Sequence, residues 1–342
     1  MSVSKIVAAA ASGVGGAGLD VDEVFSCHLY EGTSANRSIV NGIDLSGEGG
    51  LVWTKVRTQT DSHYLFDTER GVNKRLSSNA TGGQQDETAA LTAFNSNGFS
   101  LGNATAFNGN AANWGSAGNY VSWTFRKAPN FFDIVTYSGN DSNRTISHNL
   151  GSVPGMIIIK RLNNNNPWII YHRSTGNTGF QSFDFNGFAT VSNAFNNTSP
   201  TSSNFALGSR DDVNQSGGNY IAYLFAHNDG DGGFGPSGDQ DIIKCGSYSS
   251  ATEINLGFEP QWLIAKRTSS TGNWYMVNNM TGFTNAAYGP RLIADLNLAE
   301  GSDSIASVTS TGFNSQLFDG SGTYVYMAIR RGPLAVPEDA TK

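Results

Sequence analysis

The chain has 342 residues and a formal net charge of −7, and only 14% of its residues are charged. Lysine and arginine are spread along the sequence without the basic stripe that nucleic-acid binding requires, so no nucleic-acid partner is expected. Two cysteines are too few for a disulfide scaffold, and no apolar run approaches the roughly 18 residues of a membrane-spanning helix, so membrane insertion is not expected. Abundant Gly, Asn, Ser and Thr between short apolar runs are typical of a β protein with many turns.

Residues 1–19 differ in composition from the rest of the chain, because Lys5 is followed by an Ala-rich run and then by a Gly-rich one. A signal peptide is one interpretation, but the apolar core of about six residues is shorter than signal peptides normally have. A frayed terminus is another. Small side chains let a segment lie close to the backbone of a partner and become ordered there, so we predict a short N-terminal anchor segment.

A repeated pattern dominates the sequence after residue 19. Lys55, Lys160 and Lys266 are 105 and 106 residues apart, and each lies near the end of a short apolar run that predicts a buried strand. A tyrosine at a strand end precedes each run, and an aromatic or His residue, a Phe in a polar setting and an alternating strand follow it. Because these landmarks occur three times in one order, the sequence predicts three repeats.

The predicted fold class is all-β, with three tandem antiparallel β-sandwich-like repeats of about 105 residues after the short N-terminal anchor segment. Leu51, Ile157 and Leu263 are expected on equivalent core strands. A single compact three-lobed body is the alternative, since the junction between the first two repeats is short. The predicted boundaries are 1–19 for the anchor segment, 20–129, 130–228 and 241–334 for the repeats, 229–240 for a Gly/Asp linker and 335–342 for a C-terminal connector.

The linker between the second and third repeats alternates Asp and Gly, beginning at Asp229 and Asp231. Carboxylates on a Gly-rich loop suit calcium, which prefers oxygen ligands. The EF-hand spacing fails, however, because no Glu closes the loop at its twelfth position. We therefore predict a flexible, solvated linker, with a calcium site as the alternative.

Cys27 and Cys245 each lie three residues before the tyrosine of their repeat, and Ile134 fills that place in the second repeat. An interchange of Cys with Ile indicates a small hydrophobic side chain in a core. We expect both thiols to be reduced and buried.

No motif for nucleophilic, metal-dependent or phosphate chemistry is present in the sequence. We therefore assign no catalytic, cofactor-binding or metal-binding residue and expect no cofactor and no enzyme activity. His63 takes the place of Trp168 and Trp274, which indicates a structural position. Asp184 stands in an aromatic setting that a packed turn explains as well as a catalytic role would. The basic residues that close the core strands are expected at solvated strand ends, with a binding stripe as the alternative.

Together these landmarks resemble a repeat domain of structural proteins from marine tailed bacteriophages, particularly those that infect picocyanobacteria. The similarity is carried by Ser4–Ala10, Gly18–Phe25, Gly42–Trp53 and Ala222–Gly230, and it covers nearly the whole chain. The resemblance implies a virion protein, commonly a tail fibre or appendage. It implies no active-site residue.

We therefore expect a non-enzymatic phage tail fibre or tail-associated appendage or adaptor that takes part in host attachment, located in the virion and assembled in the host cytoplasm. Its expected partners are other virion proteins bound through residues 1–19, further copies in a homo-oligomer such as a trimer, and a host-surface glycan or protein. The alternatives are a glycan-binding or glycan-cleaving host-surface recognition protein and a capsid decoration protein. Exposed Trp and Tyr beside carboxylates would favour the glycan alternative, whereas aromatic residues buried in cores would favour a structural role.

Overall fold

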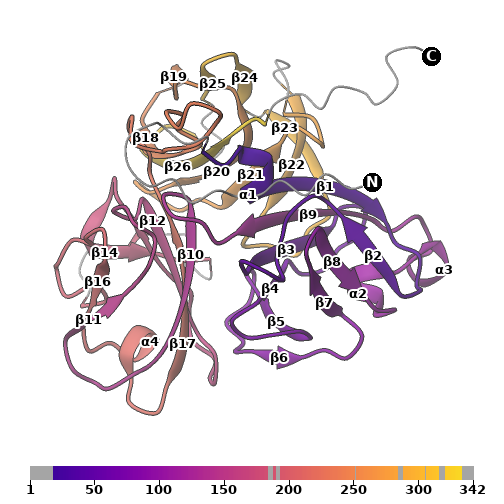
Figure 1. Cartoon of the computed structure of the whole chain (residues 1–342), viewed down its shortest axis with the longest axis horizontal. Coiled ribbons are helices and arrows are strands. Elements are labelled where there is room, and N and C mark those ends of the chain that lie inside the picture. Colours follow the sequence, from indigo (N-terminus) through magenta and orange to yellow (C-terminus); the bar gives the residue numbers. More distant parts are fainter. Residues whose placement is uncertain are drawn as a thin grey trace.

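A computed structural model describes residues 18–183, 188–189, 193–250, 252–283, 288–304, 306–315 and 320–332. Within these residues the chain consists mainly of antiparallel strands, with a few single-turn helices, so the expected all-β fold is confirmed. Three lobes follow one another in the sequence and surround a common centre (Figure 1).

Each lobe contains one six-stranded sheet, and the three sheets have the same strand order. The first sheet consists of β1 (Phe25–Glu31), β9 (Asn119–Arg126), β3 (Gly50–Val56), β4 (Tyr64–Asp67), β5 (Lys74–Ser77) and β6 (Gln85–Asp86). The second consists of β10 (Phe132–Ser138), β17 (Asn219–Phe225), β12 (Met156–Arg161), β13 (Ile169–His172), β14 (Gly176–Gln181) and β15 (Phe188–Ala189). The third consists of β18 (Ile243–Tyr248), β26 (Tyr324–Arg330), β20 (Pro260–Arg267), β21 (Trp274–Asn278), β22 (Tyr288–Ile293) and β23 (Gly301–Ser304). In every repeat the first strand pairs with the last, which closes the repeat on itself.

A smaller sheet forms a second layer in each lobe. These sheets are β2 (Arg37–Val40), β8 (Gly98–Leu101) and β7 (Leu91–Asn95); β11 (Arg144–Ser147) and β16 (Asn204–Leu207); and β19 (Glu253–Asn255), β25 (Gly312–Asn314) and β24 (Ser307–Thr309). The described helices are α1 (Val21–Val24), α2 (Thr105–Asn108), α3 (Ala111–Trp114) and α4 (Asp211–Asn214). Each lobe is thus a two-layer sandwich of one large and one small sheet.

The strands predicted to be equivalent occupy equivalent places, since β3, β12 and β20 each pair with the last strand of their repeat. Leu51, Ile157 and Leu263 lie on these strands and are buried, as expected. Pairing to the last strand makes Val52, the neighbour of Leu51, the residue-level counterpart of Ile157 and Leu263. Leu51 therefore faces the centre of the molecule, while Val52 faces the small sheet of its own lobe.

The inner faces of the three large sheets pack against one another in a single hydrophobic cluster. This cluster contains residues from every lobe, among them Trp53, Trp168 and Trp274. The first and third lobes each have a separate outer cluster under the small sheet, whereas the core of the second lobe is continuous with the central one. The chain is therefore one three-lobed body, the alternative architecture, in which sandwich-like repeats share a core.

Phe183 marks the centre of this body. Its ring makes edge contacts with Trp53 of the first lobe, Trp168 of the second and Trp274 of the third, at centroid distances of 5.9, 5.7 and 5.5 Å. Aromatic pairs in such edge-to-face geometry are favourable beyond the area that they bury. One side chain thus joins all three lobes.

The lysines of the repeat are buried, so the expectation of solvated strand ends was wrong. Lys55, Lys160 and Lys266 have no exposed surface. The Lys160 ammonium donates to the carbonyl of Thr81 in the first lobe at 2.6 Å and lies 5.4 Å from the ring centroid of Trp168. Carbonyl oxygens and an aromatic face replace the water that a buried ammonium group loses.

An aromatic residue of each later repeat reaches a backbone carbonyl of the repeat before it. Trp168 Nε1 donates to the Ser77 carbonyl at 3.0 Å, and Trp274 Nε1 donates to the Ser182 carbonyl at 2.9 Å. His63 occupies the same place in the first repeat and is buried, so its structural role is confirmed. The first and second junctions therefore use the same kind of contact.

The smaller ring of His63 is matched by a larger neighbour. Trp53 stands where the other repeats have Ile158 and Ile264, and its Nε1 donates to His63 Nδ1 at 3.2 Å. Burial, and secondarily the charge of Lys55, lowers the pKa of His63 well below its ordinary value. The pair fills the volume that isoleucine and tryptophan fill elsewhere.

His172 forms a hydrogen bond across the junction between the second and third lobes. Its Nδ1 accepts from the Ser174 backbone N–H at 3.2 Å, so its Nε2 carries the proton that is donated to the Tyr326 carbonyl at 3.0 Å. Burial lowers the pKa of His172 to about 4, although the bond to Tyr326 opposes this shift. The folded state therefore requires a neutral ring.

A fragment of residues 130–228 should fail to fold alone, because the inner face of its large sheet is covered only by the other two lobes. Circular dichroism and a denaturant titration of the fragment, with the full chain as the control, measure this. A cooperative unfolding transition of the isolated fragment would contradict a shared core.

Stability should decrease as the pH falls from about 6.5 to about 4, because over this range the unfolded chain binds a proton at His172 that the folded chain excludes. The loss from this residue is about 3 kcal/mol. His172→Gln keeps a donor for the Tyr326 carbonyl but cannot titrate, so its free energy of unfolding should fall less steeply with pH. Parallel pH profiles of the variant and the native chain would exclude this role.

Candidate functional site

The described chain begins and ends on one face of the body. Gly18 and Leu19 pair with Gly235, with N–H to carbonyl distances of 2.9 Å in both directions. Gly332 lies against Val21 and Asp22 at the start of the first repeat. We call this surface, formed by residues 18–24, 229–241 and 330–332, the terminal face.

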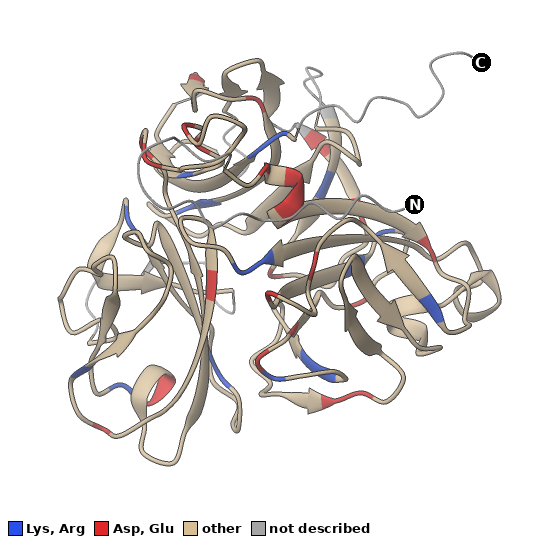
Figure 2. Cartoon of the chain, in the orientation of Figure 1, with Lys and Arg blue, Asp and Glu red and all other residues tan. Residues whose placement is uncertain are grey.

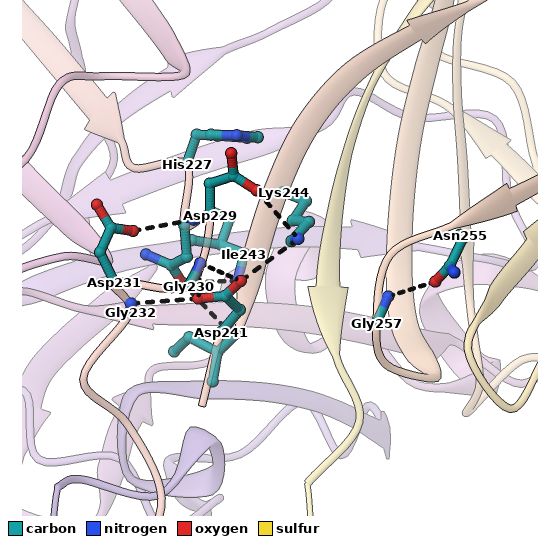
Figure 3. Close-up of polar contacts among 12 residues, drawn as sticks. His227, Asp229, Gly230, Asp231, Gly232, Asp241, Ile243, Lys244, Asn255 and Gly257 are labelled. Carbon is teal, nitrogen blue, oxygen red and sulfur yellow. Dashed lines mark hydrogen bonds and ion pairs between the residues drawn. The ribbon is translucent and has the colours of Figure 1, made fainter. Parts of the chain in front are cut away.

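The Asp/Gly connector is a folded part of the terminal face (Figure 3). The carboxylate of Asp241 accepts hydrogen bonds from the backbone N–H groups of Gly230 and Gly232, at 2.9 to 3.2 Å. Lys244 forms ion pairs with Asp241 at 3.3 Å and with Asp229 at 3.8 Å. The Asp241 side chain therefore links the end of the connector to its beginning at Gly230 and Gly232.

Two further residues anchor the connector to the body. The Asn228 side chain accepts from the backbone N–H groups of Ile242 and Ile243, at 2.9 and 3.1 Å, and donates to the Asn130 carbonyl at 2.9 Å. Phe234 is buried in the central cluster. These contacts differ from the flexible, solvated linker that the sequence predicts, because a single phenylalanine and a bridging asparagine hold the loop in place.

The carboxylates of the connector are engaged by groups of the same chain. Asp241 is occupied by N–H groups and Lys244, and Asp231 accepts from the Asp229 backbone N–H at 2.9 Å. Among the described residues, no group of three or more His, Cys, Asp or Glu side chains is arranged to hold a metal ion. The geometry of the connector lends the calcium alternative no support.

Grooves flank the chain ends on the terminal face. One, of about 370 Å³, is lined by Asp20, Val21, Pro236, Gln240, Arg330, Arg331 and Gly332. A second, about 290 Å³, is lined by Asp22, Phe25, Ser26, Cys27, Asn41, Gln261, Asn279, Met280, Arg331 and Gly332. Both have mixed polar and apolar walls, which suits a peptide segment better than a small charged substrate.

The basic side chains beside these grooves are engaged with the protein. Arg331 pairs with Glu259 at 2.5 Å. Arg330 donates to the Asp241 carbonyl at 3.5 Å and lies 5.9 Å from the ring centroid of Phe258. Such paired cations do not form the open cluster that anion binding needs.

Two further histidines, His148 and His227, make contacts with the backbone. His148 bonds to the Thr201 carbonyl at 3.2 Å, and His227 Nδ1 accepts from the Cys245 backbone N–H at 3.0 Å. Burial raises the pKa of the Cys245 thiol to about 12, so it is not a nucleophile. Asp184, the acidic residue in an aromatic setting, lies outside the described residues.

The two cysteines and Ile134 occupy equivalent strand positions, as the sequence predicts. Both thiols are free, and Cys245 is buried. Cys27 is only half-buried, so the prediction was wrong for this residue. Its different exposure follows from its place beside the second groove.

The aromatic residues lie mainly in the cores. Five tryptophans are buried: Trp53, Trp123, Trp168, Trp262 and Trp274. The large hydrophobic residues exposed in the described part of the chain are Val40, Val72, Val153, Met280 and Leu298, with no aromatic residue among them. Lys, Arg, Asp and Glu are scattered over the lobes (Figure 2). The sixth tryptophan, Trp114, is half-buried, so no aromatic residue of the described surface is fully exposed in the way that sugar stacking favours.

The fold and the terminal face define an all-β protein of three fused, pseudo-equivalent lobes. The chain belongs to the family described as a domain of unknown function (DUF7483), whose profile matches residues 20–333. This match covers all three lobes as one unit. No curated protein matches the chain. Within the described residues, no helix has the length and apolar character to cross a membrane.

Two features of the site were not predicted from the sequence. Asn228 bridges three backbone groups, and asparagine is too common in this chain for its position to stand out. Gln261 and Met280 line a groove at positions where the other repeats have different residue types. Comparison of the aligned repeats position by position would have revealed both departures.

Asp241→Asn should lower the free energy of unfolding by about 1–3 kcal/mol, because the backbone N–H groups of the connector lose a charged acceptor. Asp239→Asn changes an exposed carboxylate of the same connector and is the matched control. Thermal unfolding with and without calcium measures both effects. A calcium-dependent rise in melting temperature that Asp241→Asn abolishes would instead support a metal site.

Proposed function

We propose that this chain is a non-enzymatic structural protein of a bacteriophage particle, most simply a tail fibre component or tail-associated appendage or adaptor. The sequence resemblance to phage structural proteins is the starting point for this proposal. The observation that supports it is the burial of five of the six tryptophans, since these side chains would have to be exposed to bind a glycan.

The construction of the body supports the same role. Three lobes with one shared core give a rigid unit, whereas separate tandem domains would move relative to one another. The charges on the described surface are few and dispersed. A rigid body of this kind is suited to being multiplied in an assembly, where weak contacts per copy add up.

Attachment is assigned to the N-terminal segment. The body begins at Gly18, which pairs with Gly235 on the terminal face. Residues 2–17 contain few large side chains, and a segment of this composition suits a groove that lies close to the backbone of a partner. Other virion proteins are the partners proposed for this segment, with further copies of the chain beside it.

Deletion of residues 2–17 should leave the melting temperature unchanged but prevent incorporation into particles, because the body retains its pairing at Gly18. Mass spectrometry of purified particles from a phage that encodes the variant measures incorporation. A variant with residues 2–17 replaced by a Gly/Ser sequence of equal length is the control for length. Normal incorporation of both variants would refute the anchor, and absence of the native chain from particles would refute the virion role.

The glycan alternative is tested separately with the purified native chain. Binding to host-surface polysaccharide at micromolar concentration would favour a recognition protein over a purely structural one. The structural proposal predicts no such binding by the body.

A further inference from the structure

A tight turn joins two strands of the small sheet in the first lobe and again in the third. Residues 96–97 connect β7 to β8, and residues 310–311 connect β24 to β25. Both turns begin with serine and are followed by glycine. They differ in the residue before the glycine, which is Asn97 in the first lobe and Thr311 in the third.

The turn of the first lobe supports a neighbouring loop, residues 41–46. The Asn97 carbonyl accepts the backbone N–H groups of the first two residues of this loop at 3.0 and 3.2 Å, and the Asn95 carbonyl accepts those of its last two at 2.9 and 3.2 Å. Ile43 and Leu45 of the same loop are buried in the outer cluster of the first lobe. The position of the loop therefore depends on the geometry of the turn.

The side chain of Asn97 takes no part in this support. Asn97 is exposed, and its carboxamide forms no hydrogen bond with another described residue. Gly98 follows it, and glycine has no side chain that would keep the carboxamide away from the next backbone nitrogen. That nitrogen is a nucleophile within reach of the Asn97 Cγ atom, and asparagine is among the residues most subject to spontaneous chemical change.

The other described asparagines that precede a glycine are held in place. Asn41 Nδ2 donates to Thr124 Oγ1 at 2.8 Å, and its Oδ1 accepts from the Ile43 backbone N–H at 3.2 Å. Asn108 has no exposed surface and donates to two backbone carbonyls, at 2.6 and 2.8 Å. Rotation of either carboxamide toward the following nitrogen would break these bonds. Asn186, which also precedes a glycine, lies outside the described residues.

We propose that Asn97 deamidates spontaneously and that the reaction loosens the loop of residues 41–46. The Gly98 nitrogen bonds to the Asn97 Cγ atom while the Cγ–Nδ2 bond breaks, which forms a cyclic succinimide. The proton of the Gly98 N–H leaves with the amide nitrogen as ammonia. Water then adds to one of the two ring carbonyls and opens the ring, so that position 97 becomes either aspartate or isoaspartate.

Isoaspartate places an additional carbon atom in the backbone of the turn. Because the length of a turn sets the register of its hairpin, this insertion shifts the peptide carbonyl of residue 97. Gly98 has little freedom to compensate, since a Cβ atom there would lie only 2.0 Å from the Ile39 carbonyl oxygen. The loop of residues 41–46 then loses acceptors for its N–H groups. This loop borders the terminal face, because Asn41 lines the groove of about 290 Å³.

Peptide mapping by mass spectrometry tests the site in the purified full-length chain during incubation in mildly alkaline buffer. Conversion at Asn97 should be on the order of tenfold faster than at Asn41, the ratio that the loss of about one hydrogen bond would give. An isoaspartate-specific methyltransferase should label part of the product. Equal rates at the two positions, or no conversion at Asn97, would overturn the proposal. The inference concerns the chain itself and does not depend on its place in a particle.

Hydrogen exchange of residues 41–46 tests the effect on the loop. Exchange should become severalfold faster in the incubated native chain but not in incubated Asn97→Thr, the matched control, because threonine stands in the equivalent turn of the third lobe and cannot form the ring. Asn97→Ser is a second control of the same kind. Thermal unfolding of the fresh variants verifies that both are folded. Conversion at Asn97 without faster exchange in this loop would refute the structural effect.

Discussion

The structure depends on one constraint, which is that the inner faces of three six-stranded sheets cover one another. Each large sheet has a small sheet on its outer side, but only the other two lobes can cover its inner side. Phe183 lies where the three inner faces meet and contacts a tryptophan of each lobe. Aromatic side chains are suited to this place because they bury large apolar area and pack edge to face. The repeats are consequently parts of one body.

Much of the fold can be predicted from the sequence because the repeat spacing survives in the strands themselves. Cys27, Ile134 and Cys245 fall at equivalent positions, and His63 takes the place of a tryptophan, as the alignment of landmarks implies. The register within β3 follows from the lysine spacing, since Val52, Ile157 and Leu263 each lie three residues before the lysine of their repeat. The strand is buried on both faces, so the apolar run by itself carries no alternation that would show which of Leu51 and Val52 faces the centre.

The buried lysines show a different limit of sequence reasoning. A basic residue near the end of a strand is normally solvated, and the sequence around Lys160 contains nothing that contradicts this. Its burial depends on a carbonyl of Thr81, which belongs to the preceding lobe. The connector is similar, since Asp and Gly in alternation suit either a cation or a network of backbone N–H groups. In the folded chain Lys244 pairs with Asp241, whose carboxylate also accepts from the Gly230 backbone N–H, and these contacts favour the network.

Fusion of three repeats into one chain lets each junction evolve its own chemistry, which a trimer of identical chains cannot do. The first junction holds the buried ion pair of Asp67 and Arg70, with Tyr223 donating to Asp67 at 2.7 Å. The second uses the neutral ring of His172. The third, between lobes that no described connection links, has a groove of about 290 Å³ lined by residues of both lobes, among them Cys27 and Met280. Within the described residues the three lobes therefore share one strand order, while the contacts between them differ from junction to junction.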